Sequence, residues 1–215
     1  MRPGAVLFDC DGVIVDSEPI TDRVIAANLT RHGLPLSSSK VHGLFLGGTM
    51  GGVRDEARRR GATLPDTWVE DVYEEMFDAL RAGTPLIPGI EAVFDALDAA
   101  GVPYAVGSNG PHRKMEITLG QHPALHARLK GRVFSRHDVT RPKPAPDLYL
   151  HAAACLGALP IRCAVIEDSA TGARAARAAG MRCFGYVPSG TADRLSGVGA
   201  IPFSDMRALP ALLGL

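Results

Sequence analysis

The chain has 215 residues, of which 46% are hydrophobic, and its 23 basic residues are balanced by 23 acidic ones. This length suits one large domain, or one domain with a smaller domain inserted, and it can bury a substantial core. The balanced charge gives no case for nucleic acid or an anionic membrane as a partner. No apolar run is long enough to cross a membrane, and acidic residues follow Phe8 too closely for a signal peptide.

Strand-like and helix-like segments alternate along most of the chain. Buried strands are predicted at 5–8, 102–106, 132–135, 163–166 and 181–187, with a possible edge strand at 200–203. Helices are predicted at 90–100, 146–156 and 170–179, and others from about Pro111 and at the C-terminus. This alternation is typical of an α/β fold with a doubly wound parallel sheet that carries helices on both faces.

Residues 16–83 break this rhythm, because they show helical patterns and no convincing strand. Apolar and aromatic residues recur there at helical spacing, which indicates ordinary core packing. The segment lies between the first and second predicted strands, and a proline-rich stretch leads the chain back. We therefore expect an all-α cap domain at 16–83, inserted into a core domain made of residues 1–15 and 84–215.

The four cysteines, at positions 10, 155, 163 and 183, form no CxxC pair and have no metal-site spacing. Two of them, Cys163 and Cys183, lie in apolar strand-like runs, where a free cysteine behaves as a small hydrophobic residue. We therefore expect reduced thiols in a cytoplasmic protein. We also expect a monomer or a weak homodimer.

The first predicted strand ends in two aspartates one residue apart, Asp9 and Asp11, followed at once by Gly12. A buried strand would present Asp9 at its carboxyl end, where open α/β sheets place their ligands. Two carboxylates there can hold a hard cation, and an aspartate can also accept a phosphoryl group as a nucleophile. Strands can also end in acidic residues that have no catalytic role. The residues at the ends of the other strands are therefore needed to decide between these two interpretations.

Polar side chains follow the second predicted strand and fill a loop farther along the chain. Ser108 and Asn109 offer a hydroxyl and backbone amides to a phosphoryl oxygen, although a plain glycine-rich turn would look the same. Lys143 lies between prolines, which could aim its ammonium group inward to bind phosphate. The alternative is a lysine that faces solvent from a stiff linker.

The fourth predicted strand ends in Glu167 and Asp168. These carboxylates can complete an oxygen shell for Mg²⁺ together with Asp9 and the backbone carbonyl of Asp11. The alternative is that Asp168 or Ser169 is an ordinary N-cap of the next helix. Both roles can coexist if Ser169 caps while the carboxylates point at the metal.

In chain order these residues resemble the four motifs of the haloacid dehalogenase-like hydrolase superfamily: Asp9-Cys10-Asp11-Gly12, Ser108-Asn109, Lys143-Pro144 and Glu167-Asp168. The resemblance covers essentially the whole chain. The stretch from Phe8 to Glu18 is similar to the branch that has a helical cap after the first motif. Ser108-Asn109-Gly110-Pro111 with Lys114-Met115 is similar to bacterial sugar-phosphate phosphatases, most nearly those acting on 6-phosphogluconate.

The resemblance implies a Mg²⁺-dependent phosphatase of small phosphorylated metabolites, such as sugar or sugar-acid phosphates. Asp9 would attack phosphorus and form an aspartyl-phosphate, while Asp11 would protonate the leaving group and then activate water. The implied metal ligands are Asp9, the carbonyl of Asp11, Glu167 and Asp168. The implied phosphate-binding groups are Lys143, Ser108 and the amides near Cys10 and Asn109.

Family members contact the rest of the substrate through a cap loop. The matching loop here contains Gly47, Gly48 and Thr49, and it could equally be a plain glycine-rich connection. Lys114 and Arg54 are further candidates for substrate contact. The isolated histidines, among them His42, His112 and His137, are given no role.

Two other functions are compatible with the motifs. The first is a phosphomutase, but β-phosphoglucomutases carry a histidine in the early cap where this chain has Thr21, which favours hydrolysis. The second is a non-catalytic metabolite-binding protein. A binding module has no need of a nucleophile and an acid together, so the presence of Asp9, Asp11, Lys143 and Asp168 argues against it.

Overall fold

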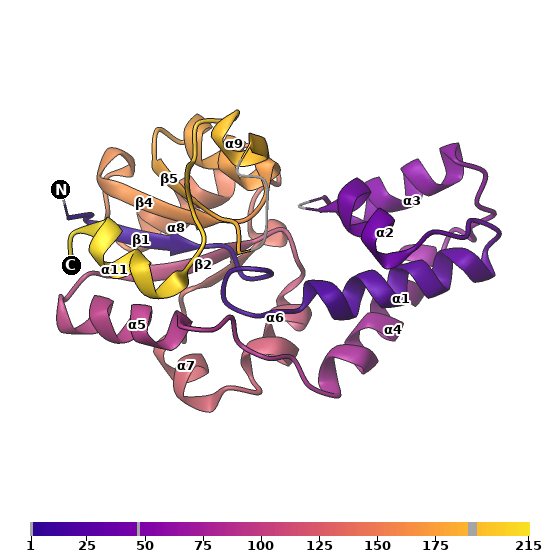
Figure 1. The fold of residues 1–215 in the computed structure, drawn as a ribbon, viewed down its shortest axis with the longest axis horizontal. Coiled ribbons are helices and arrows are strands. Elements are labelled where there is room, and N and C mark those ends of the chain that lie inside the picture. The colour runs from indigo at the N-terminus through magenta and orange to yellow at the C-terminus, as the bar shows by residue number, and fades with distance from the viewer. Residues whose placement is uncertain (1, 47, 189–192) are drawn as a thin grey trace.

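The computed structural model describes residues 2–46, 48–188 and 193–215. Within these residues six parallel strands form one sheet in the order β3-β2-β1-β4-β5-β6, so the first strand lies in the middle (Figure 1). The strands are β1 (Ala5–Phe8), β2 (Tyr104–Ser108), β3 (Val133–Ser135), β4 (Cys163–Glu167), β5 (Arg182–Tyr186) and β6 (Ile201–Phe203). The predicted doubly wound parallel sheet is confirmed, and β6 is the expected edge strand.

Helices cover both faces of the sheet, as the winding requires. Alternate residues of β1 serve the two faces: Val6 and Phe8 belong to one hydrophobic cluster, and Ala5 and Leu7 to the other. The first cluster is completed by α5 (Ile90–Ala99), α6 (His112–Leu119), α7 (Pro123–Arg128) and α11 (Leu209–Leu213). The second is completed by α8 (Asp147–Cys155), α9 (Ala170–Ala178) and α10 (Asp193–Ser196).

Three elements differ from the prediction by more than one residue. β2 spans Tyr104–Ser108, two residues later than predicted, because Pro103 has no N–H to donate and the strand instead runs on through Gly107. Ser108 is therefore the last residue of the strand. The helices α7 and α10 were not predicted, since they have only six and four residues and too few turns to show a period.

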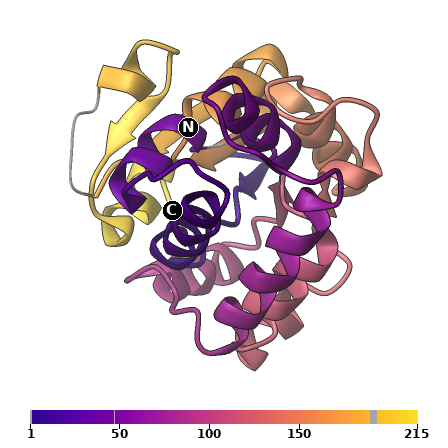
Figure 2. The ribbon, with the colours of Figure 1, turned by 90° about the vertical axis from the view of Figure 1, so that its right-hand side faces the viewer.

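The segment between β1 and β2 is helical, as predicted. It contains α1 (Glu18–Arg31), α2 (Ser38–Phe45), α3 (Met50–Arg59) and α4 (Trp68–Arg81), which lie together at the end of the molecule opposite the termini (Figures 1 and 2). These helices have their own hydrophobic cluster around Trp68, whose Nε1 donates to Asn28 Oδ1 at 2.6 Å. A separate cluster supports treating 16–83 as a cap domain, and the exact boundary stays a prediction.

Two short linkers join the cap to the core and lie side by side. The N–H of Asp16 donates to the carbonyl of Pro85 at 2.8 Å, and the N–H of Ile87 donates to that of Ile14 at 2.9 Å. The cap thus leaves and rejoins the core at one narrow place, beside the end of β1. Over the described residues, no helix combines the length and the apolar character that crossing a membrane requires.

Candidate active site

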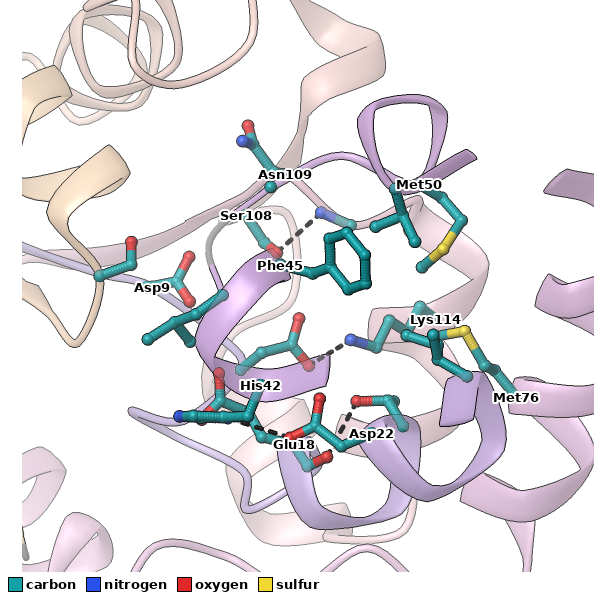
Figure 3. Close-up of a pocket in the computed structure, with 18 of the residues that line it drawn as sticks. Asp9, Glu18, Asp22, His42, Phe45, Met50, Met76, Ser108, Asn109 and Lys114 are labelled. Carbon is teal, nitrogen blue, oxygen red and sulfur yellow. Dashed lines mark hydrogen bonds and ion pairs between the residues drawn. The ribbon is translucent and has the colours of Figure 1, made fainter. Parts of the chain in front are cut away.

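The middle strands of the sheet end together. Phe8 of β1 pairs with Val106 of β2 on one side and with Ile166 of β4 on the other. The residues that follow, Asp9 among them, therefore meet at one edge of the sheet, where α/β proteins bind their ligands. The cap faces this edge, and a cavity of about 120 Å³ is lined by residues of both parts (Figure 3).

Lys143 reaches into this edge from its proline-rich loop. Its Nζ lies 2.6 Å from Asp9 Oδ1, 2.6 Å from Glu167 Oε1 and 4.5 Å from the centre of the Tyr149 ring. Burial alone would lower the pKa of Lys143, but the two carboxylates outweigh it and raise the pKa, so the side chain stays charged. The structure places this lysine inward, and the solvent-facing alternative does not apply.

Glu167 is fully buried, and protein donors occupy both of its carboxylate oxygens. Oε1 accepts from Lys143 Nζ and from the Tyr149 hydroxyl (2.7 Å), and Oε2 accepts from Ser169 Oγ (2.9 Å) and from the N–H groups of Asp168 and Ser169. Burial would raise the pKa of Glu167, but Lys143 and these hydrogen bonds lower it. Lys143 is therefore the charged partner of Glu167 in this arrangement. Ser169 also caps α9, because its Oγ accepts from the N–H of Gly172 at 3.0 Å.

Asp11 has different partners from Asp9. Lys114 Nζ lies 2.7 Å from Asp11 Oδ1, and the Ser17 hydroxyl donates to the same oxygen. Burial would raise the pKa of Asp11, but Lys114 and Ser17 lower it. For Asp9 burial prevails over Lys143 and raises the pKa to about 7. The carboxylates of Asp9 and Asp11 are therefore held in different electrostatic environments by different partners, which separates the behaviour of the two groups.

The site fits a divalent cation near Asp9 and Asp168. Burial and the neighbouring carboxylates of Glu18 and Asp9 raise the pKa of Asp168 well above its ordinary value, so negative charge is in excess there. Gly12 has a φ of 74°, and a Cβ on it would overlap the Asp168 carboxylate. Only glycine therefore leaves room for this carboxylate against the turn.

Within the described residues, no three His, Cys, Asp or Glu side chains form a ready-made metal cage. Mg²⁺ seldom uses such cages, because it binds through one or two carboxylates, water and substrate phosphate. Asp9, Asp168 and the backbone carbonyl of Asp11 fit that pattern. Glu167 does not, since both of its oxygens are already engaged.

The predicted phosphate-binding residues take distinct places. Ser108 lines the cavity, and its Oγ accepts from the N–H of Gly110 at 3.0 Å. The side chain of Asn109 clamps the backbone of Lys143, with Nδ2 donating to its carbonyl (3.1 Å) and Oδ1 accepting from its N–H (3.0 Å). The Cys10 side chain is buried in the hydrophobic core, so only its backbone is available to a phosphate. Their roles toward phosphate stay predictions.

Only part of the predicted substrate-contacting loop of the cap (Gly47, Gly48 and Thr49) lies beside the cavity. Gly47 lies outside the described residues, and Gly48 lines the cavity. Thr49 is not among the lining residues; its hydroxyl caps α3 by accepting from the N–H of Gly52 at 3.2 Å, so we no longer propose it as a substrate contact. Arg54 also lies off the cavity and pairs with Asp55.

The polar residues that the cap contributes to the cavity were not predicted from the sequence. Glu18, Asp22 and His42 line the cavity, with His42 Nδ1 at 3.0 Å from Asp22 Oδ2 and 4.0 Å from Glu18 Oε2 (Figure 3). The carboxylate of Glu18 also reaches the turn at Gly12, beside that of Asp168. Burial and the carboxylates of Asp11 and Asp22 raise the pKa of Glu18 to about 8. Their signal was the spacing of Glu18 and Asp22, one helical turn apart directly after the first motif.

The fold and the four strand-end motifs define a class of protein, and comparison with known families agrees. Residues 3–180 match the family model described as haloacid dehalogenase-like hydrolase. The chain belongs to this family.

Curated relatives in this family carry phosphatase names. The chain is 34% identical over 184 residues to the 6-phosphogluconate phosphatase of Escherichia coli K12, covering 85% of this chain and 82% of that protein. It is 30% identical over 181 residues to hexitol phosphatase A of the same organism, covering 84% and 81%. The protein is thus a phosphoric monoester hydrolase.

Solved structures agree in fold. A haloacid dehalogenase-like protein of unknown function from Agrobacterium tumefaciens superposes with a TM-score of 0.85 at 31% identity, covering 98% of this chain and 97% of that one. A family hydrolase from Deinococcus radiodurans, with bound phosphate and sodium, has a TM-score of 0.79 at 35% identity and covers 99% and 97%.

Proposed function

We propose that this protein is a Mg²⁺-dependent phosphatase of small phosphorylated metabolites, sugar or sugar-acid phosphates, that acts through an aspartyl-phosphate on Asp9. One observation carries the proposal: Lys143 holds one oxygen of Asp9 at 2.6 Å, while Lys114 and Ser17 hold Asp11 separately. A nucleophile and an acid or base are thereby kept apart although they are two positions apart in sequence. The phosphatase names of the relatives support the substrate class.

In the first step, a carboxylate oxygen of Asp9 bonds to phosphorus, and the bond from phosphorus to the leaving alkoxide breaks. Asp11 gives its proton to that alkoxide. In the second step, Asp11 takes a proton from water, which attacks phosphorus and releases Asp9 and inorganic phosphate. Lys143 neutralises charge on Asp9 and the phosphoryl group, and Ser108 is placed to donate to a phosphoryl oxygen.

The lowered pKa of Asp11 means that, without substrate, it is in the base form that the second step needs. A phosphate dianion that enters the cavity brings negative charge beside Asp11 and raises its pKa toward the acid form. Lys114 and Ser17 keep the side chain in place in both forms. The same carboxyl group therefore serves as acid and then as base.

Mg²⁺ would be held by Asp9, Asp168 and the carbonyl of Asp11, and it would supply positive charge to the nucleophile and the transferring group. We propose that Glu167 acts through Lys143, which it fixes at 2.6 Å. The cavity, at about 120 Å³, is small for a metabolite, so the cap moves away from the core to admit substrate. Its paired linkers provide the hinge. The cytoplasmic location and the weak or absent dimer stay predictions.

The test is phosphate release by Asp9→Asn with Mg²⁺ and p-nitrophenyl phosphate. We expect a loss of at least about 10³-fold in kcat, because the amide cannot form the intermediate. Asp95→Asn is the matched control, since Asp95 pairs with Arg128 on the surface of the core. Near-normal activity of Asp9→Asn in a folded protein would contradict the mechanism.

The alternative of a phosphomutase is tested in the same preparation. A bisphosphorylated sugar is added as activator together with a sugar monophosphate. We expect free phosphate to accumulate; isomerised sugar phosphate in its place would show that the phosphoryl group returns to substrate.

A further inference from the structure

The positive charges that line the cavity belong to its core side. Lys143 and Lys114 are the lysines that line it, and each is already paired with a catalytic carboxylate, at 2.6 Å and 2.7 Å. Among the described lining residues that the cap contributes, none is a lysine or an arginine. The cap side therefore offers no fixed cation to a second anionic group of the substrate.

The polar wall of the cap is made by α1 and α2. Glu18 and Asp22 lie one turn apart on α1, and α2 brings His42 Nδ1 to 3.0 Å from Asp22 Oδ2 and 4.0 Å from Glu18 Oε2 (Figure 3). A carboxylate can accept more hydrogen bonds than the imidazole supplies, and the ring has a second nitrogen. The wall therefore suits hydroxyl groups, which donate and accept.

The rest of the cap surface around the cavity is apolar. Phe45, Met50 and Met76 line the cavity as well (Figure 3). Ile25 and Val53 extend this surface. A sugar or alditol matches such a pair of walls, because it carries hydroxyls along its edges and C–H groups between them.

We propose, on the basis of the phosphatase function proposed above, that Glu18, Asp22 and His42 select an uncharged, polyhydroxylated leaving group. The preferred substrates are then monophosphates of neutral sugars or alditols. A substrate carboxylate or second phosphate would lie against the carboxylate of Asp22, while Lys114 on the core side is already paired with Asp11, and like charges brought together in this way oppose binding.

The experiment compares kcat/KM for six-carbon substrates with Mg²⁺. Glucose 6-phosphate and glucitol 6-phosphate are neutral in the leaving group, 6-phosphogluconate has a carboxylate, and fructose 1,6-bisphosphate has a second phosphate. We expect the better neutral substrate to exceed both anionic ones at least about tenfold. In Asp22→Asn, which removes one negative charge and keeps the shape, the ratio of neutral to acid substrate should fall about tenfold.

Two further variants make the result specific. Asp55→Asn removes the same charge from an exposed position on α3, where the side chain is 62% exposed, and should keep the wild-type ratio. His42→Gln should raise KM for the neutral substrate several-fold, and it tests the wall independently if Asp22→Asn does not fold.

The outcomes separate this inference from the function on which it rests. If the wild-type protein releases no phosphate from p-nitrophenyl phosphate or any sugar phosphate, the proposed function fails. If it does release phosphate, three results would overturn the inference alone: preference for 6-phosphogluconate or the bisphosphate, an unchanged ratio in a folded Asp22→Asn, or a tenfold preference for glucosamine 6-phosphate over glucose 6-phosphate. The last would show that the wall binds a cation.

Discussion

The two sides of the cavity differ in how completely their polar groups are engaged. At the sheet edge, Glu167 receives hydrogen bonds on both oxygens, and Asp9 and Asp11 each have a lysine. On the cap, Asp22 and Glu18 share one imidazole. The first arrangement fixes reacting groups in place, as chemistry requires, and the second leaves hydrogen-bonding capacity for a ligand. This difference supports the proposal that the sheet edge determines the reaction and the cap determines the substrate.

The largest expected effect comes from removing the lysine of the sheet edge. Lys143→Met leaves the buried carboxylates of Asp9 and Glu167 without their shared cation. We expect kcat to fall at least about 10³-fold and the free energy of unfolding at pH 8 to fall by about 3–5 kcal/mol. Phosphate release and urea denaturation measure the two. Arg141→Met, in the same loop but 68% exposed, should leave both kcat and stability close to those of the wild type.

A methyl group at Gly12 should weaken metal binding. Gly12→Ala forces an alanine into a φ of 74° and pushes its Cβ into the Asp168 carboxylate. We expect the Mg²⁺ concentration for half-maximal activity to rise about 10–100-fold, as for other changes that disturb ligand placement. Gly33→Ala is the control, because Gly33 has a φ of 85° and open space around its Cβ position. It should lower stability by about 1–2 kcal/mol and leave the Mg²⁺ requirement unchanged. Equal Mg²⁺ curves for both variants would remove Asp168 from the metal site.

The metal-free protein should be more stable at pH 6 than at pH 8.5. The folded protein raises the pKa of Asp9 to about 7 and that of Glu18 to about 8, against ordinary values of 3.8 and 4.5. It therefore holds protons that the unfolded chain has lost, and stability falls as pH rises through this window. The lowered pKa of Asp11 changes stability only at pH values below this window, and the raised pKa of Lys143 changes it only at pH values above the window.

Thermal unfolding measures this effect. We expect Tm to fall by at least about 3 °C between the two pH values, the shift that about 1 kcal/mol gives in a chain of this size. Mg²⁺ should raise Tm more at pH 8.5, where it no longer competes with protons. Glu18→Gln should reduce the fall, whereas a higher Tm at pH 8.5 without metal would contradict the assigned electrostatics.

The smallest effect is expected at Thr49 on the cap. Thr49→Ala removes the side chain that caps α3 and should cost about 1 kcal/mol of stability. Because Thr49 does not line the cavity, kcat/KM should stay within about twofold of wild type. A large rise in KM with normal stability would restore Thr49 as a substrate contact.

The sheet edge could be predicted from sequence because each of its groups follows an apolar run that reads as a strand. Parallel strands end on the same side, so Asp9, Ser108 and Glu167 had to meet there. What could not be predicted is how Glu167 is used. Its carboxylate oxygens are fully hydrogen-bonded in part because Tyr149 of α8 and Lys143 donate to one of them. Only the packing of the folded chain brings these two residues to Glu167.

The arrangement of Glu18, Asp22 and His42 on the cap could not be predicted from the sequence for a related reason. The spacing of Glu18 and Asp22 shows that they share a face of α1, but not which way that face points. His42 joins them from another helix, whose rotation is set by the hydrophobic cluster of the cap. An isolated histidine carries no sign of such a partner, so His42 could not be assigned a role from the sequence alone.

The most direct test of the central claim is to trap the phosphorylated enzyme. Asp11→Asn lacks the base of the second step, and p-nitrophenyl phosphate has a leaving group that needs no acid in the first. After mixing with Mg²⁺ and acid quenching, mass spectrometry should find one added phosphoryl group on the peptide that contains Asp9, and none in the Asp9→Asn variant. Steady turnover by the wild-type enzyme with no phosphorylated Asp9 in either preparation, or the phosphoryl group on another residue, would contradict it.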